Sequence, residues 1–238
     1  MINKFWNFNK TDSGETELIF NGPIAEESWL GDEITPAAFR DELSKVKGNL
    51  TVWLNSSGGD VFSASQIYTM LRNHKGKVTV KIDGIAASAA SVIAVAGDVT
   101  LITPTGMLMM HNPATLAMGN KSDMEQAIKL LEEVKESIIN AYEEKTHLSR
   151  NKIAKMMADE TWLNAKKAMS LGFVDGILFT DKKKYDPPDE VEEPEDMTAM
   201  SYSAVASMDS LIKKLSDIYK PVKGTPIDQL DKRLSLLK

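Results

Sequence analysis

The sequence predicts an α/β fold in which short, largely parallel strands alternate with amphipathic helices. Two observations carry this prediction. Short runs of apolar and β-branched residues recur through the first 110 residues, and segments with apolar side chains at helical spacing separate them. Such alternation is typical of βαβ units, whose strands are apolar on both faces because helices cover the sheet. The chain of 238 residues is long enough to bury a full core.

The first strand and helix are expected at residues 17–24 and 37–47. Thr35 suits the N-cap of that helix, because its hydroxyl can accept a hydrogen bond from a first-turn amide, and Pro36 suits the first helical position. The later elements are expected as strand 50–54, helix 64–73, strand 77–83, helix 89–96, strands 99–102 and 107–110, helices 121–145, 149–157 and 164–172, and strand 173–179.

The last three helices have start signals of their own. Ser122 and Glu125 have the spacing of a capping box at the start of the long amphipathic helix. Ser149 and Asn164 are expected to cap the two helices that follow.

The composition changes sharply after residue 180. Residues 181–196 are rich in charges and prolines and have little apolar content, which is typical of a linker. We therefore expect a folded domain at residues 1–180, an acidic linker at 181–197 and a flexible C-terminal tail with short helices at 198–238.

Composition excludes several functional classes. The net charge of −6 and the lack of an arginine-rich stripe argue against a nucleic-acid-binding protein. The lack of cysteine excludes disulfides, a thiolate nucleophile and cysteine-bound metal. The chain has no signal-peptide pattern and no uncharged apolar run of about 18 residues, so we expect no membrane association. A cytoplasmic protein without metal or cofactor is expected.

The segment Gly84–Gly97, GIAASAASVIAVAG, places a serine among very small residues. A strand is expected before it and a buried helix after it, so Ser88 lies in the turn that joins them. The amides at a helix N-terminus favour negative charge, which suits a nucleophile whose reaction develops an oxyanion. The alternative is a close-packed helix in which the small residues only permit packing.

A serine nucleophile needs a base, and the chain has three histidines. His74 lies at a basic helix end and His147 at a helix junction, where a surface role is the simpler interpretation. His111 ends an apolar strand, and Asn112 and Pro113 follow it directly. Ligands of α/β proteins bind at such strand ends, although a structural role for His111 stays open.

Two further groups complete the candidate site. The glycine pair in Asn55–Asp60 follows a buried strand and can expose backbone amides, whereas a plain turn is the alternative. Asp159 and Glu160 precede Trp162, and either carboxylate is able to orient a histidine. Acidic residues at a helix boundary also commonly face solvent.

The order of these motifs resembles the ClpP family, the proteolytic subunits of the Clp protease. The matching runs are NSSGG at residues 55–59, GIAASAA at 84–90, MMHNP at 109–113 and ETWLNAKKAMSLGFVDGI at 160–177. The resemblance covers roughly residues 18–179. It implies a ClpP/crotonase-like spiral of ββα units with a long handle helix at 121–145.

The resemblance implies a catalytic triad. Ser88 matches the nucleophile, whereas Ser91, the nearby competitor, does not fit the motif. His111 matches the general base. Glu160 matches the third member, where the family usually has aspartate, and Asp159 is the alternative. A glutamate can also hold the imidazole tautomer and stabilise imidazolium.

The resemblance also implies an oxyanion hole and a set of partners. Gly59 and Ala89 match its backbone amides. Ser88 would form an acyl-enzyme with polypeptide substrates, no cofactor is implied, and the subunits would form a heptameric ring or a double ring.

Departures from the family point to one branch of it. Ser57 stands where the glycine-pair motif commonly has proline, the N-terminal pore-loop sequence is missing, and an acidic tail is added. These features resemble the head-maturation proteases of tailed bacteriophages, which cut scaffold and capsid proteins inside proheads in the host cytoplasm. The alternatives are a general Clp-type degradative subunit that works with an ATPase unfoldase, a crotonase-fold acyl-CoA enzyme, a signal-peptide-peptidase-like protease, and a non-catalytic assembly protein.

Overall fold

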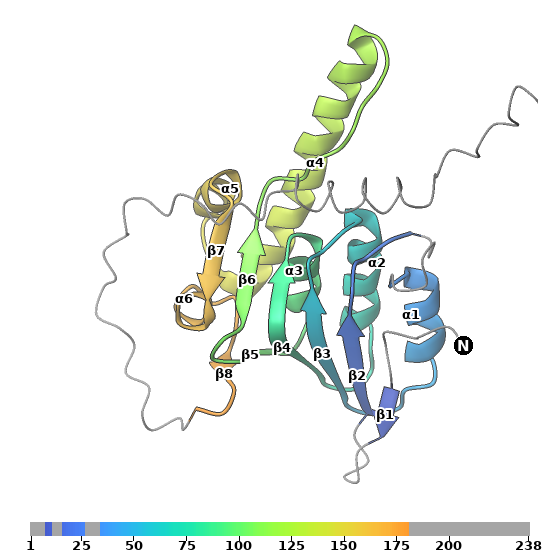
Figure 1. Ribbon diagram of the computed structural model, residues 1–238, viewed down its shortest axis with the longest axis vertical. Coiled ribbons are helices and arrows are strands. Elements are labelled where there is room, and N and C mark those ends of the chain that lie inside the picture. The colour runs from blue at the N-terminus through green and yellow to red at the C-terminus, as the bar shows by residue number, and fades with distance from the viewer. Residues whose placement is uncertain (1–7, 11–15, 27–33, 181–238) are drawn as a thin grey trace, which may run out of the picture. The chain divides into compact units, whose positions relative to one another are not determined.

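A computed structural model of the chain describes residues 8–10, 16–26 and 34–180 (Figure 1). It confirms the α/β fold: these residues form one eight-stranded sheet with six helices packed around it. The strands are β1 (Phe8–Lys10), β2 (Thr16–Asn21), β3 (Leu50–Ser56), β4 (Val78–Ala87), β5 (Val99–Ile102), β6 (Met107–Met110), β7 (Thr161–Asn164) and β8 (Gly176–Ile177). The helices are α1 (Pro36–Leu43), α2 (Val61–Arg72), α3 (Ala89–Ala94), α4 (Lys121–Thr146), α5 (Arg150–Ala158) and α6 (Ala165–Ser170).

The sheet branches at β4. Its main path runs β1-β2-β3-β4-β5-β8, and β6 pairs with β4 and β7 off this path. The first half of β4 pairs with β5, and its second half pairs in parallel with β6, with Ala87 opposite Met109. Only β1 and β7 pair antiparallel to their neighbours within this sheet. Because β4 and β6 are parallel, the residues that follow each strand emerge at the same edge.

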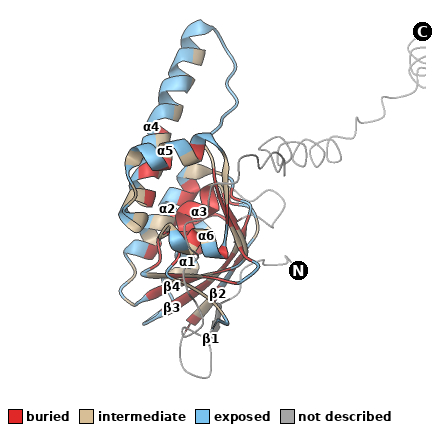
Figure 2. Ribbon diagram, turned by 90° about the vertical axis from the view of Figure 1, so that its left-hand side faces the viewer, coloured by how far each residue is buried: buried red, intermediate tan, exposed pale blue. Residues whose placement is uncertain are grey.

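The core lies between the sheet and its helices, shown by the red ribbon in Figure 2. All six residues of α3 are buried, so its run of small and β-branched side chains lies at the centre of the molecule. Tyr142 of α4 packs edge-on against Phe173, with ring centroids 5.6 Å apart. In α4 the buried residues, Val134, Ile139 and Tyr142, all lie in its second half. The first half projects beyond the sheet and is largely exposed (Figures 1 and 2).

The predicted caps are mostly confirmed. Thr35, Ser149 and Asn164 each accept a hydrogen bond from an amide in the first turn of α1, α5 and α6. The capping box of α4 was placed wrongly: Asn120 is the N-cap and Asp123 its partner. Asn120 accepts bonds from two first-turn amides and Asp123 accepts from the Asn120 amide, so this pair satisfies three amide groups.

Two expectations for the C-terminal part of the domain were also wrong. The sequence predicted a break in the helical pattern at residues 159–163 and no strand there, but residues 161–164 form β7, because they pair with β6 over four residues, a contact that no local pattern reveals. The last strand, expected over residues 173–179, is only Gly176–Ile177. The predicted linker at 181–197 and tail at 198–238 lie outside the described residues. Over the part of the chain that is described, no helix is both long enough and apolar enough to cross a membrane.

Candidate active site

Ser88 lies in the sharp turn between β4 and α3. Its backbone is left-handed, with φ 54° and ψ −126°, a conformation that costs a residue with a side chain of order 1–3 kcal/mol. The Ser88 amide donates to the Met109 carbonyl of β6 at 2.9 Å, which holds the turn at the sheet edge. Gly58 lies against this turn, since a Cβ there would come within 2.6 Å of the Ala87 oxygen. Only glycine permits this approach.

His111 is the first residue after β6, and its ring faces Ser88. The distance from His111 Nε2 to Ser88 Oγ is 2.7 Å. Burial lowers the pKa of His111, while the charge of Glu160 and a backbone hydrogen bond with Asn112 act in the opposite direction. The net lowering favours the neutral imidazole, which is the form that can accept a proton from the serine hydroxyl.

The two carboxylates beside the site have different environments. Glu160 is half-buried and is the charged side chain that acts on the pKa of His111. Its backbone is left-handed, with φ 48°, directly after α5 and before β7. The Asp159 side chain is more than half exposed and forms an ion pair with Lys155 one helical turn earlier, at 2.5 Å. Of the two carboxylates, Glu160 is therefore the one whose charge raises the pKa of His111.

The glycine pair brings backbone amides to the same edge. Gly59 has φ 146°, and a Cβ there would lie 2.0 Å from the Ile24 oxygen. The residues on either side bond to Ile24: its amide donates to the Gly58 oxygen, and the Asp60 amide donates to the Ile24 oxygen, both at 2.9 Å. Asp60 also caps α2. The backbone around Gly59 is thus fixed by several bonds.

Ser91, the nearby competitor of Ser88, and the other two histidines have other structural roles. Ser91 is fully buried and its hydroxyl bonds to the Ser88 carbonyl, so it is not available to a substrate. The Nε2 atom of His74 lies 2.7 Å from the Gly48 oxygen, in keeping with the surface role expected for it. His147 forms the left-handed end of α4. Among the described residues, no group of three His, Asp or Glu side chains is arranged to bind a metal ion.

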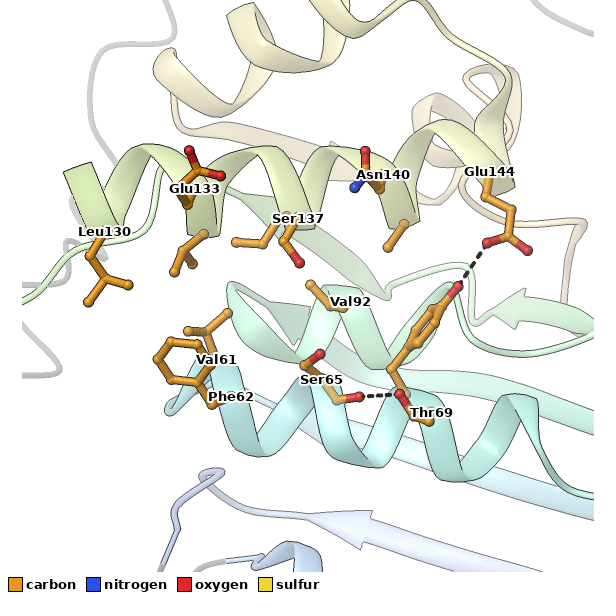
Figure 3. Close-up of a pocket in the computed structure, with 14 residues that line it drawn as sticks. Val61, Phe62, Ser65, Thr69, Val92, Leu130, Glu133, Ser137, Asn140 and Glu144 are labelled. Carbon is orange, nitrogen blue, oxygen red and sulfur yellow. Dashed lines mark hydrogen bonds between the residues drawn. The ribbon is translucent and has the colours of Figure 1, made fainter. Parts of the chain in front are cut away.

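A groove lies between α2 and α4 (Figure 3). Its volume is about 440 Å³, and apolar residues such as Phe62, Val92 and Leu130 line it. Tyr68, which also lines the groove, donates a hydrogen bond to Glu144. None of the residues that meet at Ser88 lines the groove.

Sequence reasoning missed Tyr142 as a neighbour of the Ser88 turn. Its hydroxyl lies 2.6 Å from Ser91 Oγ, which in turn bonds to the Ser88 carbonyl. The sequence signal that could have indicated this contact was a pair of polar side chains at positions expected to be apolar. Ser91 interrupts a wholly apolar helix, and Tyr142 occupies the buried stripe of α4.

Comparisons with known proteins show which family the chain resembles over its described domain. A family model described as Clp protease matches residues 28–181. The ATP-dependent Clp protease proteolytic subunit 1 of Chlamydia muridarum is 29% identical over 167 residues, which are 68% of this chain and 86% of the relative. The corresponding subunit of Deinococcus radiodurans is 24% identical over 163 residues, 68% and 79% of the two chains. The solved structure of a ClpP1 mutant from Listeria monocytogenes matches with a TM-score of 0.60 and 25% identity, over 68% of this chain and 90% of that chain.

Proposed function

Because the chain belongs to the Clp protease family, we propose that Ser88 and His111 are the nucleophile and general base of its peptidase reaction. The observation that carries this assignment is the 2.7 Å contact between Ser88 Oγ and His111 Nε2. In the proposed reaction Ser88 Oγ attacks the peptide carbonyl while its proton passes to Nε2 of His111. The same proton then goes to the leaving amine, and water hydrolyses the acyl-enzyme by the reverse transfer.

Glu160 is the third member of the proposed triad. A carboxylate in this role stabilises the imidazolium that forms when the histidine takes the proton. Glu160 fits because its charge raises the pKa of His111, whereas the Asp159 carboxylate is paired with Lys155.

The backbone amides of Gly59 and Ala89 are the proposed oxyanion hole. Ala89 is the first residue of α3, so its amide has no acceptor within the helix. Donors of this kind act on charge that develops only in the transition state, and loss of one typically costs 10²–10³-fold in kcat.

The substrates of the proposed reaction are polypeptides, and a general Clp-type subunit that works with an ATPase unfoldase is the favoured role. The named relatives from Chlamydia and Deinococcus, both subunits of ATP-dependent proteases, support it over head maturation in a phage. Cleavage of phage scaffold, like the expected cytoplasmic location, stays a prediction of the sequence alone. Assembly into rings is part of this proposal, and the exposed apolar side chains Phe62, Ile128 and Leu130 support it. Sedimentation velocity measures the assembly directly.

A serine-directed fluorophosphonate and an unfolded protein such as casein test the peptidase proposal together. The wild type is expected to gain one phosphonyl group per chain, observed by intact mass, and to cleave casein. Ser88→Ala should lose the label and about 10⁶-fold in kcat, as other serine triads do. Ser91→Ala should still be labelled, because Ser91 is buried.

The same assay separates the alternative functions. Labelling that survives in Ser88→Ala, or turnover independent of Ser88, would sink the proposed mechanism. A chain that is neither labelled nor active would instead be a non-catalytic assembly protein. Discrete cuts in a phage scaffold protein without ATP, together with no stimulation by a Clp unfoldase, would favour head maturation.

A further inference from the structure

A buried chain of hydrogen bonds links helix α4 to the carbonyl of Ser88. Ser91 donates its hydroxyl proton to the Ser88 oxygen at 2.5 Å, and the Ser91 amide donates to the same oxygen at 2.9 Å. Tyr142 Oη lies 2.6 Å from Ser91 Oγ. Since Ser91 uses its only hydroxyl proton on the carbonyl, its oxygen must accept from Tyr142. The direction of the chain is therefore Tyr142 to Ser91 to Ser88.

This chain of bonds is sealed from solvent. Ser91 is 0% exposed and Tyr142 is 2% exposed. Edge-on packing against Phe173 holds the tyrosine ring in place. Burial raises the pKa of Tyr142 to about 12, so its hydroxyl remains a donor throughout the neutral range. A low dielectric strengthens such bonds and makes each donor polarise the next.

The Ser88 carbonyl belongs to the same peptide group as the Ala89 amide. The peptide bonds of the described residues are trans, so the C=O and N–H of this planar group point in opposite directions. Two donors that fix the Ser88 oxygen therefore also fix the direction of the Ala89 N–H. Hydrogen bonds to the carbonyl oxygen draw electron density from the nitrogen, which makes that N–H a stronger donor.

We propose that Ser91 and Tyr142 are positioning residues that aim and polarise the Ala89 amide toward the oxyanion. The inference rests on the proposed function, in which Ala89 supplies an oxyanion donor. The same bonds stabilise the left-handed backbone of Ser88, because the hydroxyl and the amide of Ser91 both donate to the Ser88 carbonyl. Helix α4 is thereby connected to the reaction centre through the hydroxyls of Tyr142 and Ser91.

Tyr142→Phe is the central variant, since it removes the hydroxyl and keeps the ring. The oxyanion exists only in the transition state, so we expect kcat to fall with KM unchanged. The fall should be about tenfold, less than for loss of a whole oxyanion donor, because the Ser91 hydroxyl and amide still hold the Ser88 oxygen. Ser91→Ala should lower kcat at least as much.

Thr100→Val is the matched control. Thr100 is also fully buried, and its hydroxyl donates to the Ala94 carbonyl at the opposite end of α3, at 2.9 Å. This isosteric change removes one buried hydroxyl bond to the same helix but leaves the Ser88–Ala89 peptide alone. We expect Thr100→Val to lower the melting temperature about as much as Tyr142→Phe and to leave kcat unchanged.

A double-mutant cycle tests whether Tyr142 acts through Ser91. In the Ser91→Ala background, Tyr142→Phe should change kcat by less than about twofold, because its acceptor is already gone. Equal multiplicative losses in the two backgrounds would overturn the relay, as would a Tyr142→Phe enzyme with wild-type kcat.

The measurements are made in an order that distinguishes failure of the proposed function from failure of the positioning role alone. The wild type and Ser88→Ala are compared first, with casein as substrate. If their turnover is equal, the proposed function fails and the positioning role fails with it. If turnover depends on Ser88 but is insensitive to Tyr142 and Ser91, only the positioning role is refuted.

Discussion

Replacing Glu160 by glutamine tests which carboxylate acts on His111. The change removes one negative charge and keeps the size of the side chain. Asp159→Asn is the matched control, because it makes the same change one residue earlier, on a side chain that is more than half exposed and paired with Lys155. Each variant therefore removes one carboxylate charge, either beside His111 or from the pair with Lys155.

The structure sets the expected magnitude. An amide in place of a triad aspartate that bonds directly to the histidine ring lowers kcat about 10⁴-fold. Glu160 acts on the pKa of His111 through its charge, against the larger lowering by burial, so we expect a smaller loss of about 10²-fold. Asp159→Asn should stay within about twofold of the wild type.

The pH dependence of kcat/KM supplies a second readout. Activity requires neutral His111, so it is lost as the pH falls through the pKa of this residue. Burial already places that pKa below the ordinary 6.5, and the charge of Glu160 opposes the lowering. Glu160→Gln should therefore move the acid limb to still lower pH, whereas Asp159→Asn should leave it in place.

Peptide hydrolysis from pH 4 to 9 measures both effects in one series. An Asp159→Asn enzyme that loses activity beside an unaffected Glu160→Gln enzyme would reverse the assignment. If neither variant changes the rate or the acid limb, the triad is a Ser88–His111 dyad. An acid limb that moves upward in Glu160→Gln would refute the electrostatic argument itself.

Two further predictions concern the oxyanion edge and the buried tyrosine. Gly59→Ala should lower kcat by about 10²-fold or more, since its Cβ would lie 2.0 Å from the Ile24 oxygen and the backbone must shift. The control is Gly48→Ala, also at positive φ but with nothing within 4 Å, which should cost about 1 kcal/mol of stability and no activity, as urea unfolding and peptide hydrolysis check. In an alkaline titration followed by tyrosinate absorbance, the wild type should show one ionisation near pH 12, and Tyr142→Phe should lack this step. Above pH 10 the folded state keeps the Tyr142 proton and the unfolded state loses it, so the stability should fall as the pH rises from 10 to 12. Ionisation of all tyrosines at the ordinary pKa of 10 would contradict the burial of Tyr142.

Local signals predicted the parts of the fold that depend on a few neighbouring residues. Thr35 with Pro36, Ser149 and Asn164 were correctly assigned as helix starts, because a cap is made by a side chain and the amides two or three residues later. The cap of α4 was missed by two residues, since Asn120 and Asp123 compete with Ser122 and Glu125 for the same role. Strand β7 was missed because its partner, β6, lies some fifty residues earlier in the chain.

The candidate site also has some features that the sequence predicts and others that depend on tertiary contacts. The sequence by itself determined that Ser88 lies in a turn of very small residues between a strand and a helix, that His111 follows another strand, and that this family's motifs occur in order. Only the tertiary structure decided that β4 pairs with β6 in parallel, which brings His111 Nε2 to 2.7 Å from Ser88 Oγ. Strand pairing and side-chain direction depend on contacts between distant segments, so no local pattern contains them.

The proposed choice between the carboxylates and the role proposed for Ser91 both rest on packing. Asp159 and Glu160 are adjacent and chemically alike, but Asp159 forms an ion pair with Lys155, whereas the charge of Glu160 raises the pKa of His111. Ser91 differs from Ser88 by one helical turn, and burial alone makes it a hydrogen-bond donor rather than a nucleophile. Composition and order specified which groups were available, and the folded chain, by burying some and facing others toward each other, specified what each can do.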